Sequence, residues 1–132
     1  MTDTQRILVI DDSQAVLARA QAALNEAGYE VITTSQTVGT ARHLRSCQLV
    51  IIDYHMPGID GGEVLSSLRN AAKTAGSTPL FYLYTSDADL VGKGRALGFD
   101  GSFTDKGNDE ALVSQVNAAF RLIRLRSLSK KS

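Results

Sequence analysis

Short apolar runs alternate with longer stretches whose apolar residues recur at helical spacing. Runs of this length are too short for helices and are typical of strands buried in a parallel sheet. We predict five such strands, at residues 6–10, 29–33, 49–52, 80–84 and 101–103. The helical spacing predicts five helices between and after them, at residues 13–27, 38–46, 64–75, 87–97 and 112–123.

Capping and helix-breaking residues support most of these boundaries. Asp12 and Ser13 are candidates for the N-cap of the first helix, and Gly28 follows its end. The helix at 38–46 has the weakest apolar pattern. The helix at 87–97 contains Gly92 and Gly94, each of which costs about 1 kcal/mol relative to Ala, so we expect it to be the least rigid helix.

The alternation of strands and helices predicts an α/β fold. Strands that alternate with helices form a parallel sheet with right-handed crossovers, doubly wound so that helices cover both faces. The carboxyl ends of all five strands then meet at one edge, where open α/β sheets usually bind their ligands.

Composition limits the class of protein. The chain of 132 residues fits one domain, which we place at residues 1–125, with a short basic tail at 126–132. The 14 basic and 14 acidic residues leave no net charge that would favour nucleic acid or membrane as a partner. The single cysteine cannot form an internal disulfide, and the N-terminus lacks the basic and apolar segments of a secretory signal. No apolar run approaches the roughly 20 residues that span a bilayer, so we expect a cytoplasmic protein.

Polar side chains at the predicted strand ends suggest phosphoryl chemistry. Asp11 and Asp12 follow the first strand, and Asp53 follows the third. Carboxylates that converge repel each other unless a cation is bound, and an all-oxygen site suits Mg²⁺. The hydroxyl of Thr85 and the ammonium of Lys106, at the other strand ends, suit an anionic product, so we predict Asp53 as a nucleophile towards phosphorus.

Each of these residues also has a purely structural interpretation. Asp12 is an equally good helix N-cap, Thr85 is a β-branched residue that packs well in a strand, and a single Lys is usually solvated. The order of all five along the chain favours a site, because packing alone does not require it.

At these residues the chain resembles the receiver domain of two-component response regulators, over nearly its whole length. The resemblance implies that Asp11 and Asp12 hold Mg²⁺, that Asp53 is the phosphoacceptor, and that the backbone carbonyl of His55 is a further metal ligand. It also implies Thr85 as the switch hydroxyl and Lys106 as the partner of the phosphoryl group. Phe103 stands where the family has its switch aromatic, and it is equally a plain core aromatic.

The resemblance also implies an activity and partners. The fold would be the flavodoxin-like (βα)5 arrangement with strand order 2-1-3-4-5. A histidine kinase or histidine phosphotransfer protein would donate the phosphoryl group to Asp53, and the chain would catalyse the transfer and its own dephosphorylation without being a conventional enzyme. We expect a stand-alone receiver with a downstream protein target and a phosphorylation-linked homodimer as one form, with no nucleic acid or membrane partner.

Several positions depart from the family or vary within it. Gly107 stands where the family has Pro after a cis peptide bond; a cis bond without Pro costs roughly 2.5–4 kcal/mol, so we predict a trans bond and a looser loop. His55 and Asp87 stand at positions that vary in the family and influence phosphate lifetime, although His55 is also a plain exposed loop residue. We expect His43 to be a surface residue.

Three other functions compete with this interpretation. A degenerate receiver that binds partners without phosphate remains the main alternative, because Gly107 departs from the family. A phosphatase with an Asp nucleophile would carry Asp-x-Asp at its first strand, whereas Asp11 and Asp12 are adjacent. A nucleotide binder would need a glycine-rich loop after that strand, which is absent.

Overall fold

A parallel sheet of five strands forms the centre of the computed structural model, which describes residues 5–35, 43–44, 46–56 and 59–130. The order across the sheet is β2-β1-β3-β6-β7, and all four neighbouring pairs are parallel. The strands are β1 (Arg6–Ile10), β2 (Glu30–Thr34), β3 (Leu49–Ile52), β6 (Leu80–Tyr84) and β7 (Gly101–Phe103). This confirms the predicted parallel sheet and the 2-1-3-4-5 order.

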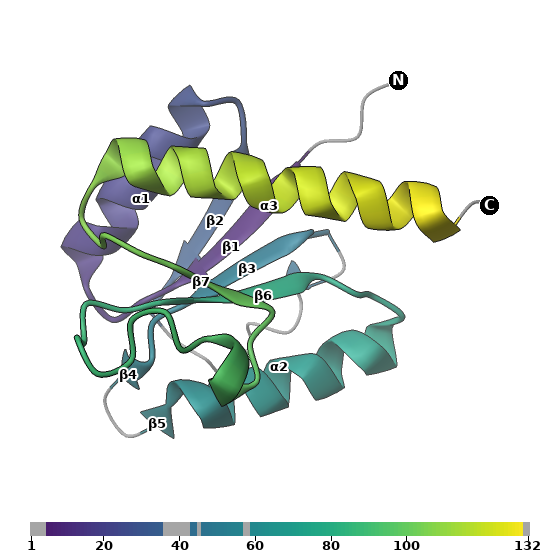
Figure 1. Ribbon diagram of the computed structural model, residues 1–132, viewed down its shortest axis with the longest axis horizontal. Helices are drawn as coiled ribbons and strands as arrows, with labels where there is room; N and C mark the ends of the chain where they lie inside the picture. The colour runs from purple at the N-terminus through teal and green to yellow at the C-terminus, as the bar shows by residue number, and fades with distance from the viewer. Residues whose placement is uncertain (1–4, 36–42, 45, 57–58, 131–132) are drawn as a thin grey trace.

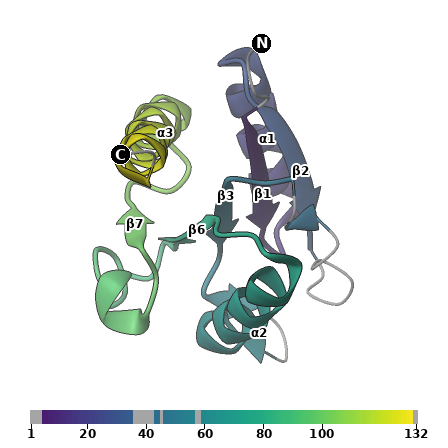
Figure 2. The ribbon, with the colours of Figure 1, turned by 90° about the vertical axis from the view of Figure 1, so that its right-hand side faces the viewer.

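Helices cover both faces of the sheet, as a doubly wound fold requires. Helices α1 (Gln14–Glu26) and α3 (Asp109–Lys130) lie on one face, and α2 (Gly61–Ala75) lies on the other (Figures 1 and 2). Residues of the strands alternate between the two layers, since successive side chains of a strand point to opposite faces. Ile7 and Val9 pack with α1 and α3, whereas Leu8 and Ile10 pack with α2.

The segment between β6 and β7 differs from the prediction. We expected a helix at 87–97, but the structure has turns followed by one 3-10 helix, η2 (Arg95–Leu97). Gly92 adopts a left-handed φ of 80°, which breaks a right-handed helix. Gly94 donates its N–H to Ser102 Oγ at 2.7 Å, and a Cβ there would lie 2.4 Å from the Gly101 carbonyl oxygen. Close packing against β7 therefore replaces the helix.

Three further segments differ from the prediction or lie outside the described residues. Most of the helix expected at 38–46 lies outside them; His43 is half-buried, and its carbonyl accepts the Ser46 N–H. An antiparallel pair, β4 (His55–Met56) with β5 (Ile59–Asp60), joins β3 to α2 and was not expected. Helix α3 continues to Lys130, so residues 126–130 are helical and the domain boundary at 125 stays a prediction.

Among the described residues, no helix has the length and apolar character needed to cross a bilayer.

Candidate functional site

Two buried carboxylates mark the carboxyl edge of the sheet. Asp11 and Asp53 directly follow the neighbouring strands β1 and β3 and are 2% and 7% exposed. The Asp53 N–H donates to the Ile10 carbonyl at 2.9 Å, and the Asp11 N–H donates to the Thr34 carbonyl at 3.2 Å. The sheet hydrogen bonding thus extends past the strand ends, so the backbone fixes where both carboxylates stand.

Ser13 is the N-cap of α1. Its hydroxyl accepts the Val16 N–H at 3.2 Å, as an N-cap does, and its own N–H donates to Asp11 Oδ1 at 2.9 Å. The capping role that the sequence left open between Asp12 and Ser13 therefore belongs to Ser13. Asp12 is exposed beside the buried pair and remains available as a ligand.

The donor set of this edge suits Mg²⁺. Asp11, Asp12 and Asp53 each offer a carboxylate oxygen, and these oxygens lie within 4.8 Å of one another. Oxygen-only ligands, one of them exposed so that water can complete the coordination, are what Mg²⁺ prefers. The carbonyl of His55 as a further ligand stays a prediction, since the structure shows only that its backbone belongs to β4.

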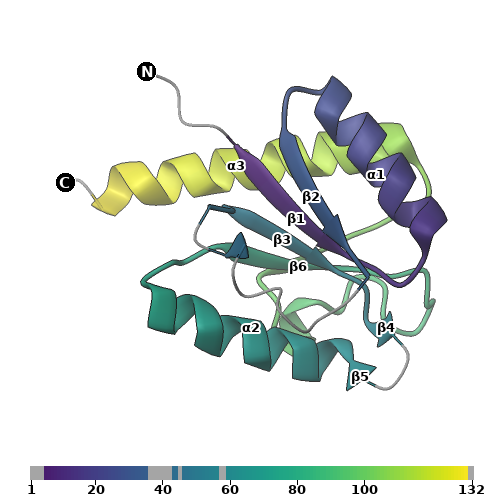
Figure 3. The ribbon, with the colours of Figure 1, turned by 180° about the vertical axis from the view of Figure 1, so that it is seen from behind.

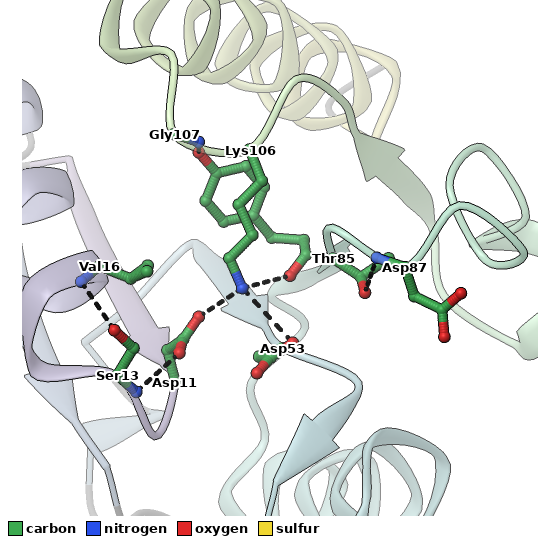
Figure 4. A network of polar contacts seen from close by, with 9 residues as sticks. Asp11, Ser13, Val16, Asp53, Thr85, Asp87, Lys106 and Gly107 are labelled. Atoms are coloured by element: carbon green, nitrogen blue, oxygen red, sulfur yellow. Dashed lines mark hydrogen bonds and ion pairs between the residues drawn. The ribbon is translucent and has the colours of Figure 1, made fainter.

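Lys106 neutralises part of the acidic cluster. Its Nζ lies 2.7 Å from Asp11 Oδ2 and 3.4 Å from Asp53 Oδ1, with only 10% of the side chain exposed (Figure 4). It also donates to the Tyr84 carbonyl at 3.2 Å. The structure therefore brings Asp11, Asp12, Asp53 and Lys106 together, as the sequence predicted, and leaves three carboxylates against one ammonium.

Tyr84 is a residue of this site that the sequence analysis missed. In addition to the carbonyl contact with Lys106, the Tyr84 ring centroid lies 5.3 Å from the Lys106 ammonium. The Tyr84 hydroxyl accepts the Gly107 N–H at 3.3 Å. Burial raises the pKa of this hydroxyl above its usual value, which keeps it neutral at physiological pH. The alternation of Tyr82, Tyr84 and Phe103 on one face was the available signal, but it indicates only core packing.

The loop at Gly107 is tethered, contrary to the loose loop that we expected. The bond between Lys106 and Gly107 is trans, which confirms that prediction. The Gly107 N–H bonds to Tyr84, and its carbonyl accepts a hydrogen bond from Arg19 Nη2 at 2.7 Å. Proline has no N–H and cannot adopt the φ of 99° found here, so glycine makes a contact that the family's usual residue cannot.

Replacing Gly107 by Ala tests whether this loop positions Lys106. Gly28 is a matched control because its φ of 101° is nearly the same, and a Cβ meets nothing within 4 Å at either site. A left-handed non-glycine residue costs about 1–2 kcal/mol, so both variants should lose similar stability in urea unfolding. If Asp53 accepts a phosphoryl group, as the resemblance to receiver domains implies, only G107A should slow its uptake; equal uptake by G107A and G28A would contradict the positioning role.

Thr85 is buried at the end of β6, with its hydroxyl turned to the following loop. Its Oγ1 accepts the Asp87 N–H at 3.1 Å (Figure 4). Asp87 Oδ1 in turn accepts the Asp89 N–H at 2.9 Å. These consecutive side-chain bonds form tight turns. Because a hydroxyl can donate while it accepts, Thr85 retains a proton for a further acceptor.

Phe103 lies in the core in this structure. It is 2% exposed and stacks on Tyr82 with ring centroids 4.5 Å apart, while its contact with Tyr84 is edge-on at 6.5 Å. The core role is therefore shown, and the switch role stays a prediction. Through Tyr84 it lies one side chain away from Lys106.

A known family model matches the sequence over most of its length. The family model for the response regulator receiver domain matches residues 7–117. The chain belongs to the response regulator receiver family.

Comparison with individual proteins supports this assignment. Protein PilG of Pseudomonas aeruginosa is 27% identical over 120 residues, which cover 89% of this chain and 88% of PilG. The transcriptional regulatory protein TcrA of Mycobacterium tuberculosis is 33% identical over 96% of the chain. The chain spans only 46% of TcrA and 12% of CqsS, a sensor kinase/phosphatase of Vibrio cholerae that it also matches.

Solved structures show the same fold. The response regulator TrrA of Thermotoga maritima, in complex with Mg²⁺ and BeF, superposes with a TM-score of 0.70 at 27% identity, over 87% of this chain and 98% of TrrA. The chemotaxis response regulator CheY4 of Vibrio cholerae also gives 0.70, at 22% identity and the same coverage of both chains.

Proposed function

We propose that the chain is a phosphorylation-driven switch whose phosphoacceptor is Asp53. The observation that carries the proposal is the position of the Lys106 ammonium, which lies between the buried carboxylates of Asp11 and Asp53. A cation held at a nucleophilic carboxylate suits chemistry in which negative charge arrives with the substrate. A histidine kinase or a histidine phosphotransfer protein would be the donor.

In the proposed transfer, a carboxylate oxygen of Asp53 forms a new O–P bond while the P–N bond to the donor histidine breaks. The electron pair of that bond returns to the imidazole of the donor. Asp11, Asp12 and Asp53, with the His55 carbonyl, would hold Mg²⁺, which when bound neutralises charge on the phosphoryl oxygens. In dephosphorylation, water attacks phosphorus and the O–P bond to Asp53 breaks, which returns the free carboxylate and releases inorganic phosphate.

The same residues provide the switch. Lys106 would pair with one phosphoryl oxygen on Asp53, and Thr85 would donate its hydroxyl proton to another. Thr85 is hydrogen-bonded to Asp87, at the start of the segment that joins β6 to β7. Movement of Thr85 would therefore move this segment as well. Phe103 would then move into the space left near Tyr84. The altered segment between β6 and β7 would present a different surface to a downstream protein.

Similarity to PilG, over 89% of this chain and 88% of PilG, supports a stand-alone receiver. Such a receiver acts through its contacts with other proteins, and we place this activity in the cytoplasm. The site makes the alternative, a module that binds partners without phosphate, less favoured, because that function does not require an ammonium held between two buried carboxylates.

Incubation with a small-molecule phosphodonor tests this proposal. Intact-mass spectrometry should show one added phosphoryl group per chain when Mg²⁺ is present and none when EDTA removes it. Metal dependence is expected because three carboxylates around an incoming phosphoryl group are neutralised only in part by Lys106. Absence of uptake with Mg²⁺ would favour the phosphate-independent module instead.

A further inference from the structure

A pocket lies at the edge of the sheet where the strands begin, opposite the carboxylate cluster. Helices α2 and α3 both end on this side of the sheet (Figures 1 and 3). The last turns of α2, the residues that lead into β6 and the later part of α3 contribute to its lining. Its volume is about 320 Å³, and small-molecule sites typically have volumes of about 300–1,000 Å³. The pocket is therefore large enough for a small ligand.

The unequal lengths of β6 and β7 create this pocket. The first residue of β7, Gly101, pairs with Tyr82, so β6 begins two residues before its partner. Next to Phe81 stands Asp100 instead of a strand, and its Oδ2 accepts the Phe81 N–H at 2.8 Å. Among the described residues, no strand lies beside the start of β6 on this side. The residues just before β6 line the pocket there.

Asp100, the acidic residue in the described lining, already has its partners. Its Oδ2 lies 3.5 Å from Arg69 Nη2, in addition to the bond from Phe81. Arg69 is held as well, because it donates to the Gly98 carbonyl at 2.8 Å and its guanidinium carbon lies 4.9 Å from the Phe81 ring centroid. This pair balances its own charge, so any further charge in the pocket is in excess.

Two further cations line the pocket and give it that excess of positive charge. Lys73 comes from α2 and Arg126 from α3, which cover opposite faces of the sheet. Both are exposed, and within the part of the chain that the structure describes neither has an ion-pair partner. Lys73 alone could be explained by the negative end of α2. That explanation does not account for a second cation that reaches the same pocket from the other face.

Neutral donors and apolar surface complete the lining. Thr78 is exposed, and neither its N–H nor its hydroxyl is bonded to another described residue, so both can donate to a ligand. Ala72 and Pro79 are buried and add apolar surface. The pocket thus combines two unpaired cations and free donors with a surface that an organic group can contact.

We propose that this pocket binds a phosphate group, either as inorganic phosphate or as the monoester of a small molecule. Lys73 and Arg126 would pair with its oxygens, and Thr78 would donate a hydrogen bond to it. A phosphate monoester carries close to two negative charges at neutral pH, which match the two unpaired cations. Hydrogen bonds between charged partners are roughly twice as strong as neutral ones.

The pocket is independent of the proposed phosphoacceptor. None of its residues belongs to the carboxylate cluster, and binding there requires neither Mg²⁺ nor a covalent step. Failure of phosphate binding would leave the role of Asp53 untouched, and a protein that is never phosphorylated at Asp53 could still bind phosphate in this pocket.

Backbone amide NMR of the protein in EDTA tests the proposal residue by residue. Inorganic phosphate, adenosine monophosphate and adenosine are titrated separately at constant ionic strength. The amides of Ser77, Thr78 and Phe81 should shift saturably with both phosphates and should not shift with adenosine. Tighter binding of adenosine monophosphate would identify a monoester as the ligand, and equal affinities would identify free phosphate.

Substitutions of the two cations test their role. Lys73→Ala or Arg126→Ala should each weaken phosphate binding at least about tenfold, because each removes a hydrogen bond between charged partners. Arg124→Ala is the matched control, since Arg124 is exposed on the same helix but does not line the pocket. Absence of saturable shifts at these amides with either phosphate would overturn the proposal. K73A and R126A proteins that bind as tightly as R124A would overturn it as well.

Discussion

Replacing Asp53 by Asn is expected to abolish phosphoryl uptake while leaving the fold intact. Asn keeps the size of the side chain but its amide oxygen is a far weaker nucleophile than a carboxylate oxygen. The Asp53 backbone N–H bond to Ile10 is unaffected by the substitution. With one fewer carboxylate in the cluster, electrostatic repulsion falls, so the metal-free variant should unfold at the same or a higher temperature.

Intact-mass spectrometry with Mg²⁺ and a small phosphodonor measures the uptake. Asp100→Asn is a useful comparison, because Asp100 is a partly buried carboxylate away from the cluster, bonded to the Phe81 N–H at 2.8 Å. Asp100→Asn should be phosphorylated as wild type is. Uptake by Asp53→Asn at the wild-type rate would show that another residue accepts the phosphoryl group.

Replacing Lys106 by Met is expected to destabilise the metal-free protein by about 3 kcal/mol, because removing one partner of a buried ion pair leaves its charge uncompensated. Asp11 and Asp53 would both lose the ammonium, which lies 2.7 and 3.4 Å from them. Met preserves most of the apolar stem that packs near Tyr84, so the loss reflects charge rather than volume.

Mg²⁺ should restore much of this stability. A ligand that binds only the folded state stabilises it, and without Lys106 the carboxylates depend on the metal for neutralisation. Thermal unfolding with Mg²⁺ and with EDTA should therefore show a larger metal-dependent shift for K106M than for wild type. Lys93→Met, which removes an exposed ammonium, should show the wild-type shift. Equal shifts in K106M and wild type would mean that Lys106 does not neutralise the metal site.

The sheet and the acidic cluster could be predicted because both depend on local sequence. A buried strand such as residues 49–52 needs only a short apolar run, and the parallel order brings Asp11 and Asp53 to one edge whatever the loops do. Ser13 as the N-cap was also within reach of local rules, although Asp12 was an equal candidate until the structure showed the Val16 contact.

Features that depend on contacts between distant residues could not be predicted. The helix expected at 87–97 fails because Gly94 packs directly on β7, a contact that no local pattern reports. The loop at Gly107 was expected to be loose because only the missing Pro was visible in the sequence. Its tethers, Tyr84 and Arg19, are distant in the chain and meet it only in the folded protein.

Chemical identification of the phosphorylated residue is the most direct test of the account. Borohydride reduces an aspartyl phosphate and leaves an altered residue that peptide mass spectrometry can locate after phosphorylation with Mg²⁺. The modified residue should be Asp53, and the modification should be missing from protein treated with EDTA. Reduction at Asp11, Asp12 or any carboxylate other than Asp53, or at none, would contradict the proposed function.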